Sequence, residues 1–385
     1  MSALLNSEKK SQKYLDQDRQ LLLLKDIINI STNNNNISIK KNNIILDYIY
    51  LTKILAAFSV VLLHANTSFW NFKYNEYKKY WKSCNLMIGI FYFAVPSFVL
   101  CIGATLLNFN EKYGIKEYYR KRIIKVAFPL LGWSVLLYFY RVYFLKNMEK
   151  ENINFVYLWN LYYKHKINHI FSSLHSFLII YMIIPLVAYV EKSEKMKIYS
   201  YCLITLFITQ MLIPYLIKLL QPSLFWFYYI KIELTIYIFA GYIIQNNKFS
   251  QKIRILIYLF GILGLFLIIY GTRILTLKYK KLIRLHLGYL NVPCFLYSCS
   301  IFLFIKESSF RIFKKINKEF IIKLGQLTIG PFFLHYPIID TYSKFFNVNK
   351  YNLKYRLFDG IIICIICFII TAFLKKILIL KYLVP

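Results

Sequence analysis

The fold is decided by the stretch LDYIYLTKILAAFSVVLLHA, residues 46–65. Fifteen of its 20 residues are hydrophobic, and its length matches the roughly 20 residues that an α-helix needs to cross a hydrocarbon core about 30 Å thick. Nine further apolar stretches of similar length follow along the chain. We therefore predict an all-α fold, a polytopic transmembrane helical bundle of about ten spans. The spans are expected near residues 44–67, 85–108, 123–145, 170–190, 198–220, 223–245, 253–272, 288–305, 320–345 and 357–381.

Composition and charge agree with a protein whose main partner is a lipid bilayer. Hydrophobic residues make up 58% of the 385 residues, above the roughly 45–50% of ordinary globular domains, and the mean hydropathy is +0.47. The net charge is +32, but the Lys and Arg residues lie mostly in short segments between apolar runs. Basic flanks of this kind hold helix ends at anionic head groups. The charge therefore indicates a membrane and excludes a nucleic-acid partner.

The chain outside the spans predicts its domains and orientation. Residues 1–43 are polar, contain a run of Asn at 33–36 and lack the apolar core of a signal peptide. We expect a partly disordered cytoplasmic tail there, followed by one membrane domain over residues 44–385. An even number of spans puts both termini on one side, where Lys and Arg are in excess. The positive-inside rule then places both termini in the cytoplasm, and the expected location is a bacterial cytoplasmic (inner) membrane.

The seven cysteines predict neither a disulfide framework nor a metal site. Most of them lie inside apolar runs, where thiols behave as small hydrophobic groups. Cys364 and Cys367 have the spacing of a redox or metal motif, but a second pair and a nearby His are missing from the sequence around them. Helix packing is the favoured interpretation, and we expect no metal.

The first span carries two polar residues, Lys53 and His64. Charged side chains in mid-membrane cost about 2.5–3.5 kcal/mol on insertion scales and usually face a bundle interior. Eleven residues make three helical turns plus about 20°, so both side chains share one face and lie about 16 Å apart along the axis. We expect them to look into one interior pocket. Alternatively, Lys53 snorkels to the interface and His64 makes a local hydrogen bond.

A basic cluster stands just before and inside the third span, at Arg120, Lys121, Arg122 and Lys125. Cations this close together suit a polyphosphate such as that of coenzyme A. For the charges alone, an ordinary positive-inside anchor is the favoured alternative.

Further polar residues interrupt other spans, and each is a candidate for a site or for a structural hydrogen bond between helices. Lys231 and Glu233 are about 200° apart around a helix and cannot pair directly. Two prolines near His335 break the hydrogen-bond ladder, as often happens beside polar cavities in membrane bundles. The full set is Arg141, His175, Lys231, Glu233, His335 and Asp340.

Four stretches together resemble the acyltransferase-3 family of integral membrane O-acyltransferases. The opening span is similar to that family's first span, with Lys53 standing where Arg is usual and the spacing to His64 intact. AVPSFVLCIGATLL, residues 94–107, is similar to the family's second span, with Ile102 replacing the usual Ser.

The third of the four stretches is the most specific. YYRKRIIKVAFPLLGWS, residues 118–134, resembles the family's basic cluster followed by Pro and Trp-Ser. LTIGPFFLHYPIID, residues 327–340, is similar to its late Gly-to-His-Pro span and places His335. LHSFLIIYMIIP, residues 174–185, is a weaker match around His175.

This resemblance implies transfer of an acyl group, usually acetyl from acetyl-CoA or another acyl-CoA, to a hydroxyl of a cell-surface or lipid-linked glycan. By analogy, His64 would be the catalytic imidazole and Lys53 would take the place of the essential Arg. A His can remove the hydroxyl proton, and a cation would stabilise the donor phosphates or the developing oxyanion. The cluster at Arg120 to Lys125 would hold coenzyme A. A glycan exporter or transporter built on the same bundle is the alternative.

Overall fold

A computed structural model of the chain describes residues 47–146, 172–220, 234–313 and 316–384. All the regular secondary structure in these ranges is helical, as predicted. The contacts divide the chain into residues 1–49 and 50–385. Of the first unit the structure describes residues 47–49, which are helical, and everything that follows concerns the second.

Six helices in the described residues are long and apolar enough to cross a membrane, so the predicted count of about ten is not confirmed. One shorter apolar helix, Leu174–Ala188, accompanies them. The six are Asp47–Ala65, Lys78–Glu111, Ile115–Leu145, Lys195–Leu220, Gln251–Lys278 and Tyr355–Leu374.

The remaining predicted spans fall on helices of a different extent. The stretch predicted at 320–345 is divided into α14 (Lys318–Gly325) and α15 (Ile329–Phe345), and the turn between them lines a cavity described below. The stretch predicted at 288–305 falls on α13 (Val292–Phe313), which continues into a charged segment. Apolar composition therefore located the helices better than it located their ends.

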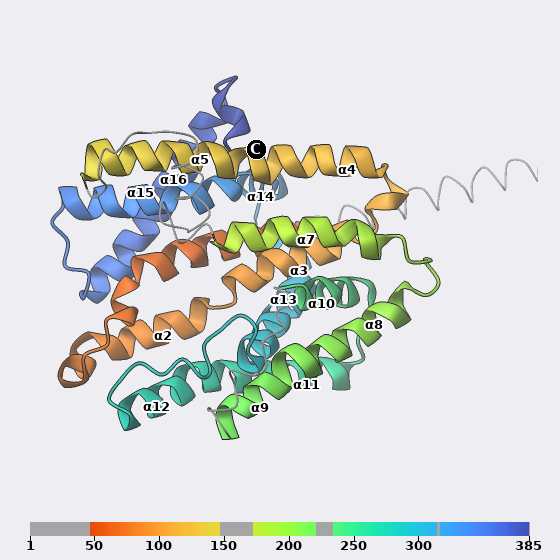
Figure 1. The fold of residues 1–385 in the computed structure, drawn as a ribbon, viewed down its shortest axis with the longest axis horizontal. Helices are drawn as coiled ribbons and strands as arrows, with labels where there is room; N and C mark the ends of the chain where they lie inside the picture. Colours follow the sequence, from red (N-terminus) through yellow and green to blue (C-terminus); the bar gives the residue numbers. More distant parts are fainter. Residues whose placement is uncertain (1–46, 147–171, 221–233, 314–315, 385) are drawn as a thin grey trace, which may run out of the picture. The chain divides into compact units, whose positions relative to one another are not determined.

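Close helix packing forms the centre of the bundle. Helix α3 (Ala94–Leu106) packs against α10 (Ile236–Asn246), α7 (Ser172–Ala188) and α13, and α10 also contacts α13 (Figure 1). A Cβ atom added to Gly103 would lie 2.0 Å from the carbonyl oxygen of Ile238, and one added to Gly241 would lie 2.2 Å from that of Leu100. Small residues let membrane helices approach this closely, so these two glycines set the α3–α10 distance.

A second set of contacts places the helices around the candidate site. Helix α15 packs against α16 (Gly360–Leu374), and α7 packs against α3 and against η5, a π-helical turn at Ile123–Ala127. Turns of this type occur frequently at functional sites. The arrangement surrounds one interior space with α3, η5, α7 and α15.

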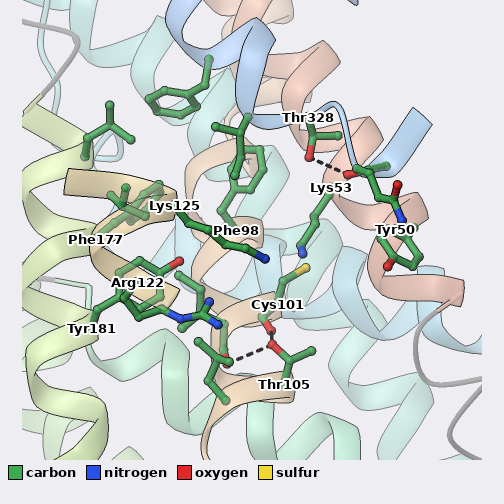
Figure 2. A pocket seen from close by; sticks show the side chains of 18 of the residues that line it. Tyr50, Lys53, Phe98, Cys101, Thr105, Arg122, Lys125, Phe177, Tyr181 and Thr328 are labelled. Carbon is green, nitrogen blue, oxygen red and sulfur yellow. Dashed lines mark hydrogen bonds between the residues drawn. The ribbon is translucent and has the colours of Figure 1, made fainter. Parts of the chain in front are cut away.

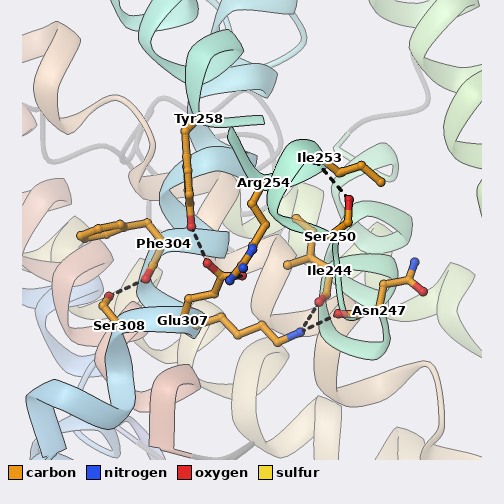
Figure 3. A network of polar contacts seen from close by, with 10 residues as sticks. Ile244, Asn247, Ser250, Ile253, Arg254, Tyr258, Phe304, Glu307 and Ser308 are labelled. Atoms are coloured by element: carbon orange, nitrogen blue, oxygen red, sulfur yellow. Dashed lines mark hydrogen bonds and ion pairs between the residues drawn. The ribbon is translucent and has the colours of Figure 1, made fainter. Parts of the chain in front are cut away.

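The end of α10 is held by a polar network from α13, shown in Figure 3. The Lys306 ammonium donates hydrogen bonds to the carbonyl oxygens of Ile244, Gln245 (3.0 Å) and Asn247 (3.2 Å). The last carbonyls of a helix lack partners within the helix and carry a partial negative charge. Lys306 therefore serves as a cationic cap that joins the two helices.

Replacing Lys306 with Met is expected to lower the free energy of unfolding by about 2 kcal/mol, because the carbonyl groups lose a charged donor. Thermal unfolding of the purified protein in one detergent would measure this. The matched control is Lys252→Met, at an exposed position on α11 (Gln251–Phe266), which should unfold like the parent. Equal losses in both variants would contradict the capping role.

Candidate active site

A cavity of about 410 Å³ opens inside the bundle, between the first span, α3, η5, α7 and the turn that joins α14 to α15. We call it the Lys53 cavity. Its volume lies within the range of small-molecule sites, about 300–1,000 Å³. Aromatic side chains form much of its wall, namely Tyr50, Phe98, Phe177, Tyr181, Phe332 and Phe333. The first four are labelled in Figure 2.

Four cationic side chains line the Lys53 cavity, namely Lys53, Arg122, Lys125 and Lys375, and its lining contains no Asp or Glu among the described residues. In Figure 2 the amines of Lys53 and Lys125 and the guanidinium of Arg122 point into the same space. Lys375 follows directly after α16, and its ammonium donates to the carbonyl of Gln326 at 3.0 Å. Such a concentration of positive charge in a partly enclosed space favours an anionic ligand.

The predicted basic cluster divides into two pairs. Arg122 and Lys125 reach the cavity, and positions three residues apart are neighbours on a helix surface. Lys121 instead forms an ion pair with Glu117 at 2.8 Å, and Arg120 is exposed; neither lines the cavity. Their predicted contact with a cofactor remains a prediction.

Arg122 is held among aromatic rings. Its guanidinium lies 5.7 Å from the ring centroid of Tyr118 and 5.6 Å from that of Tyr181. Its buried Nε has no hydrogen-bond partner among the described residues. Cation–π contacts orient the planar fork, and the remaining donor is left for a ligand such as a phosphate.

Two histidines that are 271 positions apart in the sequence meet inside the bundle. The rings of His64 and His335 lie with their centroids 4.8 Å apart and their planes at 35°. His335 is fully buried in α15, whereas His64 is half-buried near the end of the first span. The sequence predicted each as a candidate but gave no sign that they pair.

The hydrogen bonding of His335 fixes its tautomer. Its Nδ1 lies 2.8 Å from the carbonyl oxygen of Pro331, and a carbonyl can only accept, so Nδ1 carries the proton. In a neutral imidazole Nε2 is then an acceptor. This buried atom has no hydrogen-bond partner in the described part of the chain. A buried acceptor without a partner is costly, and such atoms are retained where a ligand or a reacting group supplies the bond.

The histidine pair lies next to the Lys53 cavity and outside its lining. Phe332 lines the cavity, and its ring centroid is 6.3 Å from that of His335. Lys53 lines the cavity as well, but His64 does not. Phe332 therefore lines the cavity and also lies beside His335, and the single pocket predicted for Lys53 and His64 stays a prediction.

The other predicted polar residues lie elsewhere. His175 is half-buried on α7 and is not in the cavity lining, although its neighbours Leu174 and Phe177 are. Asp340, on α15, lines a smaller open cavity of about 370 Å³, and Arg141 is half-buried in the third span. Lys231 and Glu233 lie outside the described residues. The functional roles predicted for these residues stay predictions.

The described residues contain no cluster of three or more His, Cys, Asp or Glu side chains that could hold a metal ion. Cys364 and Cys367 are buried free thiols on α16. Their placement agrees with the helix-packing interpretation.

One cavity residue was missed in the sequence. Lys375 lies at the end of the last span, where a Lys is most simply interpreted as a head-group anchor. Its place in the cavity depends on α16 packing against α15, and the local sequence contains no signal for that contact.

The described residues form a helical protein with six helices long and apolar enough to cross a membrane, and a cation-lined cavity lies beside the His64–His335 pair. The acyltransferase-3 model, which describes an acyltransferase domain, matches residues 46–375. The chain therefore belongs to the acyltransferase-3 family of membrane acyltransferases. Comparisons with curated proteins and with solved structures found no significant match.

Proposed function

We propose that the protein transfers an acyl group, acetyl in the simplest case, from coenzyme A to a hydroxyl of a cell-surface or lipid-linked glycan. The observation that carries this proposal is the His64–His335 pair, 4.8 Å apart beside the cation-lined cavity. A base next to an anion site is what thioester attack by a hydroxyl requires. The family membership supports the acyl-transfer part.

The Lys53 cavity is the proposed donor site. Its four cations would bind the phosphates of an acyl-CoA, and its aromatic wall would contact the adenine ring and the pantetheine arm. Under the proposed orientation, with both termini in the cytoplasm, the ends of α4 (Ile115–Arg122) and α16 that carry Arg122 and Lys375 face the cytosol. Acyl-CoA is made there, so the donor would enter from the side where it is available.

The separation between Lys53 and His64 supports a contact of the Lys53 cation with the donor's phosphates. Eleven residues of helix place them about 16 Å apart along the axis. A cation at that distance is too far to stabilise an oxyanion that forms beside His64. The extended pantetheine arm would bridge the two, passing Phe332, with the phosphates at Lys53 and the thioester at the histidines.

In the proposed transfer one imidazole, that of His64, both removes and returns the proton. His64 takes the proton from the glycan hydroxyl as its oxygen attacks the thioester carbonyl, and a C–O bond forms. The tetrahedral intermediate breaks its C–S bond, and the imidazolium returns the proton to the leaving thiolate. The products are an acyl ester and free coenzyme A. His335 is assigned as a positioning residue: its Nε2, which has no partner among the described residues, would accept a hydrogen bond from His64 when the substrates are bound, and the other ring nitrogen of His64 would then be the base.

The test is a strain that lacks the gene. We expect its surface polymer to be present in normal amount but to lose its O-acyl groups, as measured by NMR of the purified polymer after mild and after alkaline extraction. Plasmid copies of the wild type should restore the ester signal, and a His64→Ala copy expressed at the same level should not. Polymer that accumulates inside the cell would identify an exporter and overturn the proposal.

A further inference from the structure

A second basic cavity, of about 580 Å³, lies beyond the C-terminal end of the first span. It is formed by α2 (Lys82–Phe91) with the turn before it, by η10 (Leu267–Gly271) with the start of α12 (Thr272–Lys278), and by η11 (Tyr355–Asp359) with the preceding loop. We call it the Arg356 cavity. None of its described lining residues is acidic. Five of them are cationic: Lys78, Lys79, Lys82, Arg273 and Arg356.

The wall of this cavity contains a buried guanidinium. Arg356 is 1% exposed, and its two terminal nitrogens donate to Asn66 Oδ1 (3.1 Å), Cys84 Sγ (2.7 Å) and Ser83 Oγ (2.7 Å). Its Nε donates to the carbonyl of Asn352 at 3.3 Å. These partners are all uncharged. A buried charge is expensive unless an opposite charge is near, and the ion pairs found among the described residues do not include Arg356. An anion in the cavity would supply the missing charge.

Other lining residues fit a sugar. Asn85 lines the cavity, and its Nδ2 donates to the carbonyl of Ile269 at 2.8 Å, whereas its buried Oδ1 has no partner among the described residues. A free amide oxygen accepts a hydrogen bond from a hydroxyl. Tyr270 and Tyr351 also line the cavity; the Tyr270 ring stacks on Phe266, and the Tyr351 ring meets Tyr80 edge to face. The cavity thus combines positive charge with groups that match a saccharide.

The wall of the Arg356 cavity lies close to the histidine pair along the chain. Asn66, which accepts from Arg356, stands two residues after His64 on the chain, about 3 Å along a helix axis. The Lys53 cavity lies toward the other end of the same span. The histidines therefore stand between two cation-lined cavities, one at each end of the first span.

We propose that the Arg356 cavity binds a phosphate group of a phosphate-bearing saccharide, which is the acceptor in the transfer. This inference rests on the proposed function, because it names the class of glycan that reaches His64. Lys82 and Arg273, at the rim, contact the phosphate, and Arg356 supplies a fixed positive field behind them. Asn85 accepts a bond from a sugar hydroxyl. The phosphate would hold the saccharide while another of its hydroxyls meets His64.

The test measures phosphate binding separately from catalysis. Full-length protein in phosphatidylcholine nanodiscs is titrated calorimetrically with inorganic pyrophosphate, in the presence of saturating coenzyme A to fill the Lys53 cavity. We expect one site in the wild type and at least tenfold weaker binding in Lys82→Gln/Arg273→Gln. The control is Lys248→Gln/Lys252→Gln, two exposed lysines outside both cavities, which should bind like the wild type. No binding, or equal binding by all three proteins, would overturn the proposal.

Two further arms identify the source of the phosphate. In turnover with acetyl-CoA, the rim variant should show at least tenfold higher KM for a polyprenyl-diphosphate-linked disaccharide, with an unchanged KM for the donor. A KM that stays the same would contradict an acceptor role. If nanodiscs of phosphatidylglycerol abolish pyrophosphate binding while the linked disaccharide does not compete, the site holds a lipid head group, and the acceptor assignment fails. Absence of any turnover would remove the proposed function, whereas the titration would still decide whether the cavity binds phosphate.

Discussion

Replacing His64 with Ala is expected to reduce kcat for glycan acylation by about 10²–10⁴-fold, the range that general acid–base groups contribute. The reason is chemical: a glycan hydroxyl is a poor nucleophile at neutral pH, and His64 is the more exposed imidazole of the pair. The measurement is release of free coenzyme A from acetyl-CoA by purified protein supplied with acceptor. Binding of coenzyme A should be unchanged, because His64 does not line the Lys53 cavity.

His335 gives the same experiment a second, distinguishable result. Because it is proposed to orient His64, His335→Ala should lower kcat by about 10–100-fold, as loss of a supporting hydrogen bond does, and should shift the pH profile of kcat while leaving both KM values in place. His175→Ala is the matched control, since this histidine is also half-buried in a membrane helix but lies outside the cavity lining. Full activity in the His64 variant, with thermal stability preserved, would remove the pair from the mechanism.

The helical class of the fold was readable from the sequence, because runs of about 20 apolar residues have few other uses. The predicted number of about ten spans is not confirmed, since six helices in the described residues have the length and composition of a span. The turn between α14 and α15 and the charged end of α13 depend on how polar groups are satisfied inside the bundle. How polar groups are satisfied depends on tertiary contacts. A hydropathy pattern therefore predicts where these helices lie but does not tell which of them cross a membrane.

The site was predictable in its parts and not in its assembly. A His or a Lys in an apolar span is an energetic anomaly that sequence reveals, and Lys53, His64 and His335 were found in this way. The 4.8 Å contact between His64 and His335 joins residues on the first span and on α15, and no local pattern encodes it.

Cations at the ends of spans were harder to assign to a cavity from the sequence. Lys375 and Arg356 have the sequence signature of ordinary positive flanks, yet the structure places each in the lining of a cavity. Conversely, Arg120 and Lys121 belong to the cluster that resembles a coenzyme A site but lie outside the cavity lining. The cations that line a cavity differ from those that do not in the direction of the side chain, and helix packing sets that direction.

Substitution of Gly241 by Leu is expected to cause the largest loss of stability, about 3 kcal/mol or more, because the first added carbon would already lie 2.2 Å from the backbone oxygen of Leu100. Backbone cannot rotate away as a side chain can, so α3 and α10 would have to separate, and overpacking of this kind costs about 1–3 kcal/mol even where side chains give way.

The apparent melting temperature in detergent should fall by about 5 °C or more. Gly114→Ala is the matched control, since a Cβ there meets nothing within 4 Å and its φ of −76° suits any residue; because Gly114 is the N-cap of α4, where Ala is less favourable than Gly, it should unfold at or slightly below the parent temperature and lose far less than Gly241→Leu. Gly103→Ala/Gly241→Ala tests the same contact from both sides. Once one substitution has pushed the helices apart, the second has less to displace, so the double loss should be smaller than the sum of the single losses. Strictly additive losses would mean that the two glycines act independently and that the close α3–α10 approach is not what they maintain.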